Sequence, residues 1–186
     1  MAKRSLRSLL NDYFPDCKQQ QQLKAKFLAF EASSDQVFKR SHLVGHFCGS
    51  AWVVDYHAER VVLMHHKKLQ KWLQPGGHCD GDVDVEAVAR KEAAEETGLD
   101  NLTLVVENIF DLDLHAIPEH KGVPAHLHYD VRFLFRAPEG ARLVQNEESH
   151  ALQWFPLSAT FPTAEESVLR LQRKALAVIE SSCVSS

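Results

Sequence analysis

The residues of this chain that are best suited to chemistry are three glutamates close together in sequence. Glu92, Glu95 and Glu96 lie near the end of a predicted helix at about residues 84–97, and Gly98 follows it. Gly is common directly after the last helical turn. At 100° per residue, the apolar residues of the first half and the three glutamates fall within one broad sector. A helix face that begins apolar, and should face a core, therefore ends in carboxylates.

This arrangement is unfavourable unless something binds the carboxylates. Like charges one turn apart repel each other, and they cost more free energy when they lose water. A divalent cation, which prefers several oxygen ligands, would remove both costs. The alternative interpretation is a solvated Glu/Lys face at the end of a helix. Such a face would lie opposite the apolar residues, so the observed position favours a metal site.

A loop must precede this helix, and it would position the helix N-terminus. Segment 75–77 is Pro-Gly-Gly, which suits neither a helix interior nor a strand interior. Asp82 or Asp84 is a suitable N-cap and interacts favourably with the helix dipole. The sequence therefore predicts loop, helix and loop across residues 75–100.

A strand with one polar face is predicted at residues 126–136, where polar and apolar residues alternate. Its polar face carries His126, His128, Asp130 and Arg132. Such a face is either open to water or the wall of a site. The charged pair beside the two histidines favours the wall of a site.

Another strand is predicted at residues 42–55, from its small and β-branched residues. Gly45 and Gly49 share one face, as expected where another backbone or a ligand comes close. His42 and His46 lie on the opposite face. We interpret these histidines as structural or pocket-lining, with metal binding as the alternative.

The stretch from Trp72 to Leu99 resembles the Nudix box, written G-x5-E-x7-R-E-U-x-E-E-x-G-U with U a bulky aliphatic residue. The matching residues are Gly77, Glu92, Glu95, Glu96, Gly98 and Leu99. Val83 stands where the pattern has Glu, Lys91 stands where it has Arg, and Ala93 is small for the first U. Lys91 keeps the positive charge but lacks the planar group with which Arg binds a carboxylate through two hydrogen bonds.

The segments around the box, at residues 72–77, 128–130 and 154–157, are similar to a bacterial group of Nudix proteins without a settled substrate. The resemblance implies an α/β (α+β) fold, a Nudix-like αβα sandwich with a mixed β-sheet. We expect an N-terminal helical extension at residues 1–40 and a Nudix hydrolase domain at residues 41–182.

The ends of the chain are predicted to be helical. In the N-terminal extension, Pro15 ends a first helix and Asp16 caps a second. This pair packs either on the domain or across a homodimer interface. Near the C-terminus, Thr163 and Glu166 are expected to form a capping box for a last helix.

The resemblance implies hydrolysis of a nucleoside diphosphate linked to another moiety, as in a nucleotide sugar, a dinucleotide or a nucleoside triphosphate. The cofactor would be Mg²⁺ or Mn²⁺. Our hypothesis is that Glu95 and Glu96 hold the metal, and that Glu92 binds metal or takes the proton from water. Glu148 is a second candidate for the base, unless it belongs to a solvated loop. The residues predicted to bind substrate are Gly76, Gly77, Lys91, His126, His128 and Asp130.

Two other functions stay open. A binding module that keeps the fold without catalysis is favoured by Val83 and Lys91. Isomerase chemistry on an isoprenoid diphosphate, which some relatives with this fold perform, would require a reactive thiol, and Cys79 lies beside the box. A buried and inert thiol is the alternative for Cys79.

Composition limits the classes of function. The formal net charge of −4 gives no basic surface for nucleic acid, and no apolar run is long enough for a membrane span. The start of the chain does not have the pattern of a signal peptide. The cysteines show neither a CxxC motif nor a zinc-like spacing, which predicts free thiols in a cytoplasmic protein. They are Cys17, Cys48, Cys79 and Cys183.

Overall fold

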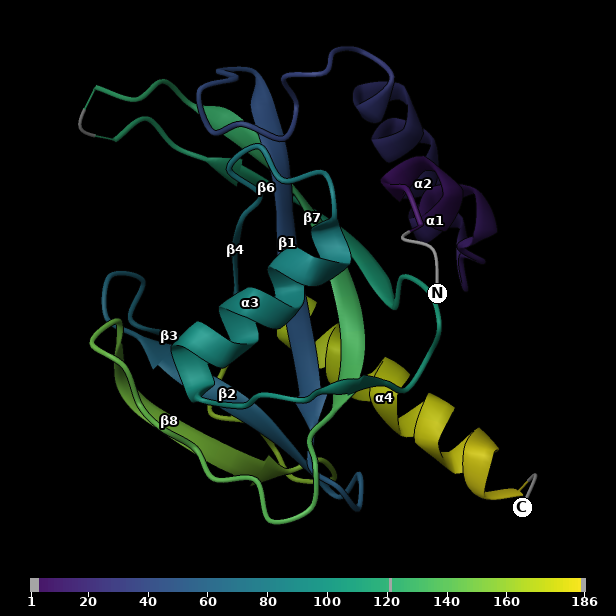
Figure 1. Ribbon diagram of the computed structural model, residues 1–186, viewed down its shortest axis with the longest axis vertical. Coiled ribbons are helices and arrows are strands. Elements are labelled where there is room, and N and C mark those ends of the chain that lie inside the picture. The colour runs from purple at the N-terminus through teal and green to yellow at the C-terminus, as the bar shows by residue number, and fades with distance from the viewer. Residues whose placement is uncertain (1–3, 121, 185–186) are drawn as a thin grey trace. The chain divides into compact units, whose positions relative to one another are not determined.

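The protein has an α+β fold with a mixed β-sheet and flanking helices, as the sequence predicted (Figure 1). The computed structural model describes residues 4–120 and 122–184. The chain divides into two compact units. The first contains residues Met1–Ser50, Gly76–Glu92 and Val106–Phe133, and the second contains Ala51–Pro75, Ala93–Val105 and Leu134–Ser186.

In the first unit, the strands run in the order β4, β1, β7, β6. The N-terminal part of β1 (Gly45–Val54) pairs antiparallel with β4 (Gly76–His78), and β7 (His126–Arg136) pairs antiparallel with β6 (Asp111–Ile117). Between β1 and β7, the N–H of Leu127 donates to the carbonyl of Val44. The bounds predicted for β7 are confirmed, whereas β1 begins three residues later than predicted.

In the second unit, β2 (Arg60–His66) is the central partner. It pairs antiparallel with the end of β1, with β3 (Lys71–Leu73) and, along its full length, with β8 (Ser149–Pro156). Figure 1 shows β2 between β3 and β8. The end of β7 pairs with the short β5 (Thr103–Leu104). The N–H of Ala137 donates to the carbonyl of Val54, so β7 continues beside β1 here.

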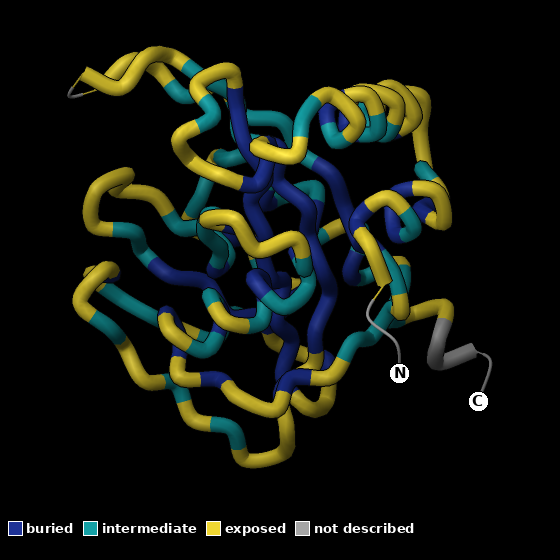
Figure 2. Tube along the Cα trace, turned by 45° about the horizontal axis from the view of Figure 1, so that its top comes forward, coloured by how far each residue is buried: buried dark blue, intermediate teal, exposed yellow. Residues whose placement is uncertain are grey.

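Every residue of β1 is buried, and Figure 2 shows long buried stretches of the trace in dark blue. Burial on both faces explains its run of small and β-branched residues, because each face must pack against another layer. A helix comes close to β1 at Gly49. A Cβ placed there would lie 2.7 Å from the carbonyl oxygen of Val85 and 3.1 Å from the N–H nitrogen of Ala89.

We therefore expect Gly49→Ala to destabilise the protein by about 1–3 kcal/mol, the usual cost of an overpacked core. The atoms that the new methyl group would meet belong to the helix backbone, so the helix must move. Urea unfolding monitored by circular dichroism measures the effect. An unchanged midpoint of unfolding would contradict the close approach of this helix to β1.

That helix is α3 (Val85–Thr97), and its capping matches the prediction. The N–H of Ala87 donates to the Asp84 carboxylate at 3.0 Å. Gly98 follows with φ +71°, a left-handed conformation that favours Gly after a helix. The helix starts in the first unit and ends in the second.

The two predicted N-terminal helices are present as α1 (Leu6–Asp12) and α2 (Lys18–Glu31). The prediction that Asp16 caps α2 is wrong. The N-cap is Cys17, whose extended backbone starts the helix without a side-chain hydrogen bond. In the first unit, Phe30 of α2 stacks on Tyr129 of β7 at 3.8 Å between ring centroids. Helix α2 therefore packs on a strand of its own chain.

The predicted C-terminal helix is α4 (Glu166–Val184). The Thr163 hydroxyl accepts from the N–H of Glu165 at 3.2 Å, one residue earlier than the predicted capping box requires. The reason is that the helix begins only at Glu166, so Thr163 acts on the turn before it. Among the described residues, no helix combines the length and apolar character needed to cross a membrane.

Candidate active site

The three glutamates of the predicted metal site all lie on α3, and they differ in burial. Glu96 is buried, with 6% of its surface exposed, whereas Glu92 is half-buried and Glu95 is exposed. A buried carboxylate in the last turn meets the negative end of the helix dipole and loses water, and both effects are unfavourable. Glu96 is therefore the least solvated of the three carboxylates.

In the first unit, Gly77 and Glu92 lie against each other. A Cβ at Gly77 would lie 2.4 Å from one Glu92 carboxylate oxygen and 2.5 Å from the carboxylate carbon. The absence of a side chain at Gly77 leaves the space that this carboxylate occupies. The ammonium group of Lys91 lies 3.7 Å from the other Glu92 oxygen. Gly77, Lys91 and Glu92, all predicted site residues, are thus brought together.

In the second unit, the loop that carries Glu148 is attached to the end of α3. The N–H of Val144 donates to the carbonyl of Thr97 at 2.8 Å, and the Asn146 amide donates to the carbonyl of Glu95 at 3.1 Å. The Asn146 side chain also accepts from the N–H of Glu148 at 3.0 Å. Glu148 is exposed, and it lies two residues after Asn146, which contacts the end of the helix directly.

At Asp130 and Arg132, the polar face of β7 is not open to water, so it is the wall of a site or a core network. Asp130 is 4% exposed and Arg132 is 1% exposed. The Ser50 hydroxyl donates to Asp130 at 2.7 Å, and the Arg132 guanidinium donates to the same carboxylate at 2.7 Å. The pair is joined by three side chains of the adjacent β6, namely Asp111, Asp113 and His115.

The charges in this network decide the pKa of Asp130. Burial alone would raise its pKa, but the positive charge of Arg132 and hydrogen bonds from His115 and Ser50 hold it well below the usual range. Asp130 is therefore ionised at neutral pH and already engaged by protein groups. Its predicted contact with substrate stays a prediction.

His126 and His128 come together at the other end of the same face, with their Nε2 atoms 3.2 Å apart. Desolvation, with repulsion from His78 and His46, lowers the pKa of His128 to about 3. Desolvation also lowers the pKa of His46 to about 4. The imidazoles of His128 and His46 are therefore neutral at pH 7.

Sequence reasoning did not bring His46, Cys48 and His78 to this face. In the structure, these side chains gather with His128. The two-residue spacing of His46 and Cys48 placed them on one face of β1, and this was the available signal. The pairing of β1 with β4 and β7 could not be predicted from local pattern, because it joins segments far apart in the chain.

Cys79, the thiol on which the isomerase alternative depends, is buried, with 4% of its surface exposed. Burial, reinforced by the negative charge of Asp82, raises the pKa of this thiol far above its usual value. A protonated, enclosed thiol is a poor nucleophile. The structure therefore favours the inert interpretation of Cys79.

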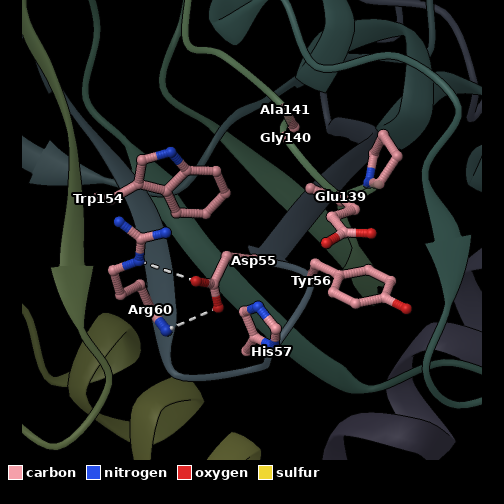
Figure 3. Close-up of a pocket in the computed structure, with 10 residues that line it drawn as sticks. Asp55, Tyr56, His57, Arg60, Glu139, Gly140, Ala141 and Trp154 are labelled. Atoms are coloured by element: carbon pink, nitrogen blue, oxygen red, sulfur yellow. Dashed lines mark hydrogen bonds and ion pairs between the residues drawn. The ribbon is translucent and has the colours of Figure 1, made fainter.

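A pocket of about 140 Å³ lies in the second unit, at the turn between β1 and β2 (Figure 3). The Asp55 carboxylate accepts from the backbone N–H of Glu59 at 2.8 Å and from the Arg60 guanidinium at 2.8 Å. Burial would raise the pKa of Asp55, but the hydrogen bonds from Arg60 and Glu59 lower it. This carboxylate holds the turn, and the residues lining the pocket include none of the predicted site residues.

Comparison with known proteins gives the family. A family model described as the NUDIX domain matches residues 47–175, which is more than half of the chain. The chain therefore belongs to the Nudix family, and this confirms the enzyme class that the sequence predicted, a Nudix-type pyrophosphohydrolase. Among curated proteins, no match was found.

Solved structures show the same fold. A C. elegans Ap4A hydrolase in a binary complex is 18% identical, with a TM-score of 0.59, over 73% of this chain and 98% of that chain. The E. coli dihydroneopterin triphosphate pyrophosphohydrolase is 19% identical, with a TM-score of 0.56, over 74% and 96%. RenU, a Nudix hydrolase from M. smegmatis, is 20% identical, with a TM-score of 0.53, over 74% and 88%.

Proposed function

We propose that this protein is a Mg²⁺- or Mn²⁺-dependent hydrolase that cleaves the pyrophosphate bond of a nucleoside diphosphate linked to another moiety. The observation that carries the proposal is the set of three glutamates on α3, one of which is buried at the helix end. Similar folds in proteins named for hydrolysis of Ap4A and of dihydroneopterin triphosphate support this substrate class.

The residues present fit a hard divalent cation. Glu92, Glu95 and Glu96 offer oxygen ligands, which Mg²⁺ and Mn²⁺ prefer. Gly77 leaves open the space that the Glu92 carboxylate fills. A bound metal would neutralise charge on the phosphoryl oxygens and lower the pKa of a bound water. In this proposal, Glu95 and Glu96 hold the metal.

The remaining roles belong to side chains that orient substrate or move a proton. Water attacks phosphorus, the bond from phosphorus to the bridging oxygen breaks, and the proton of the water passes to Glu92 or Glu148. Glu148 suits this role because its loop is hydrogen bonded to the end of α3. The backbone at Gly76 and Gly77 and the charge of Lys91 would contact the phosphates. The contact that the sequence predicted between the rest of the substrate and His126, His128 and Asp130 stays a prediction.

A screen of nucleotide sugars, dinucleotides, nucleoside triphosphates and capped RNA, each with Mg²⁺ and with Mn²⁺, tests the proposal. Release of a nucleotide and a phosphorylated remainder is expected for at least one class.

The second candidate function, a binding module without catalysis, is favoured by the replaced box positions Val83 and Lys91. It predicts ligand binding with no turnover in either metal. The proposal also includes a cytoplasmic location, and it is compatible with a homodimer.

Gly77→Ala tests the position of the Glu92 carboxylate. The new methyl group would occupy the place of that carboxylate, so the side chain must turn away. We expect kcat/KM to fall about tenfold or more, since small displacements of a catalytic group are costly. Because the displaced atoms are the end of a flexible side chain, the midpoint of urea unfolding should change little. A variant with full activity would contradict a role for Glu92 at this position.

A further inference from the structure

One face of the sheet in the first unit gathers a cysteine and three histidines from three adjacent strands. Cys48 of β1 is the direct partner of His78 in β4. His46 lies two residues before Cys48, and it therefore shares the face of Cys48. His128 comes from β7 on the other side of β1. One potential ligand atom from each of the four residues lies within 4.8 Å of the others.

These separations are close to those of a tetrahedral metal site. Zinc binds imidazole nitrogen and thiolate sulfur at about 2.0–2.3 Å, so its ligand atoms lie roughly 3.3–3.8 Å apart. The imidazole rings are also mutually close. The His46 centroid lies 4.9 Å from that of His78 and 4.7 Å from that of His128. Side-chain rotations that move the ligand atoms by about 1 Å would bring all four onto one ion.

His46 gives an independent indication of a ligand. Its surface is 2% exposed, and neither ring nitrogen makes a hydrogen bond of good geometry within the described part of the chain. A buried polar group without a partner costs about 1–3 kcal/mol, so such groups usually have a bound water, ion or ligand. A cation held by one nitrogen of His46 would remove part of this cost.

We propose that His46, Cys48, His78 and His128 form a structural zinc site. Three nitrogens and one sulfur are a ligand set that selects Zn²⁺ over Mg²⁺, and four protein ligands leave no open position for a substrate. On binding, Cys48 releases its thiol proton to solvent and coordinates as thiolate. Metal-bound His128 is not free for substrate, so the site replaces the substrate-binding role predicted for this residue.

The zinc site is separate from the carboxylates of α3. Gly49 and Gly77, the residues that α3 approaches, alternate in sequence with Cys48 and His78. Successive residues of a strand point to opposite faces. The four ligands therefore lie on the face of the sheet opposite to Glu92, and the proposal does not depend on the proposed hydrolase function.

Metal analysis and cobalt substitution test the site on the full chain. The purified protein is expected to contain one zinc per chain after dialysis against zinc and then metal-free buffer. Protein stripped of metal and titrated with Co²⁺ should develop the thiolate-to-cobalt charge-transfer absorption. Cys48→Ser should lose this absorption and bind zinc at least tenfold more weakly. The matched control is Cys79→Ser, a buried thiol one position after His78, and it should retain both.

A second control tests whether the zinc site is independent of the proposed hydrolase site. Zinc content should be unchanged when Glu92, Glu95 and Glu96 are all replaced by Gln. Natively folded wild-type protein without zinc or cobalt binding would overturn the proposal. Absorption that persists in Cys48→Ser and disappears in Cys79→Ser would overturn the ligand set. Cys48→Ser is near-isosteric, so a folded variant that has lost zinc reports the missing thiolate.

Discussion

Glu95→Gln combined with Glu96→Gln should lower kcat/KM by about a thousandfold or more with Mg²⁺. Metal ions contribute several kcal/mol of transition-state stabilisation to phosphoryl transfer, and each 1.36 kcal/mol is a factor of ten. The change keeps side-chain size while removing two of the three charges that would hold the ion. Steady-state assays on the best substrate of the screen measure it, with circular dichroism to verify the fold.

The matched control for this double variant is Glu86→Gln, which removes a carboxylate from another face of the same helix. Glu86 forms an ion pair with Arg90 one turn later, at 2.8 Å. We expect its kcat/KM to remain within about twofold, because a single half-buried i,i+4 pair on another face of the helix does not contact the proposed metal site. Full activity of the double variant would remove the metal role of Glu95 and Glu96.

Arg132→Met should have the largest effect on stability, a loss of about 3–5 kcal/mol. The guanidinium is 1% exposed, and it lies 2.7 Å from Asp130, 2.8 Å from Asp113 and 3.5 Å from Asp111. Methionine fills a similar volume but removes the guanidinium charge that these three carboxylates share. Removal of one partner from a buried ion network costs far more free energy than the complete network contributes. Urea unfolding of the variant and the wild type measures the loss.

Two variants separate this cause from simple loss of packing. Adding Asp130→Asn to Arg132→Met removes one uncompensated charge, so part of the lost stability should return. Arg173→Met, which breaks an exposed ion pair with Glu166, should change the free energy of unfolding by less than about 1 kcal/mol. A loss below that value for Arg132→Met, without rescue by Asp130→Asn, would contradict the network.

The elements around the predicted site could be read from local pattern. The bounds of β7 follow from strict alternation over residues 126–136, and α3 follows from the Asp84 cap, the apolar stripe and Gly98. The pairing of Gly45 and Gly49 with close neighbours was also predicted, and their Cβ positions are blocked by backbone. The bounds of β7 and α3 depend on residues close in sequence, and the glycine positions follow from residue type alone.

Features that depend on tertiary context were missed. The first turn of α2 uses the extended backbone of Cys17, although Asp16 has the stronger intrinsic capping tendency. Cys48 was interpreted as an ordinary free thiol because the cysteines have no zinc-like spacing. Its neighbours His78 and His128 arrive through the β4 and β7 pairings, and no local period encodes these. The buried state of Asp130 and Arg132 likewise depends on the charges contributed by β6.

Binding of Mn²⁺, followed by electron paramagnetic resonance of the free ion, tests the central claim most directly. Zinc-loaded wild-type protein and Cys48→Ser should both bind Mn²⁺, whereas replacement of Glu92, Glu95 and Glu96 by Gln should weaken binding at least a hundredfold. Equal Mn²⁺ affinity in the triple variant and the wild type would contradict the claim that these carboxylates hold the catalytic metal.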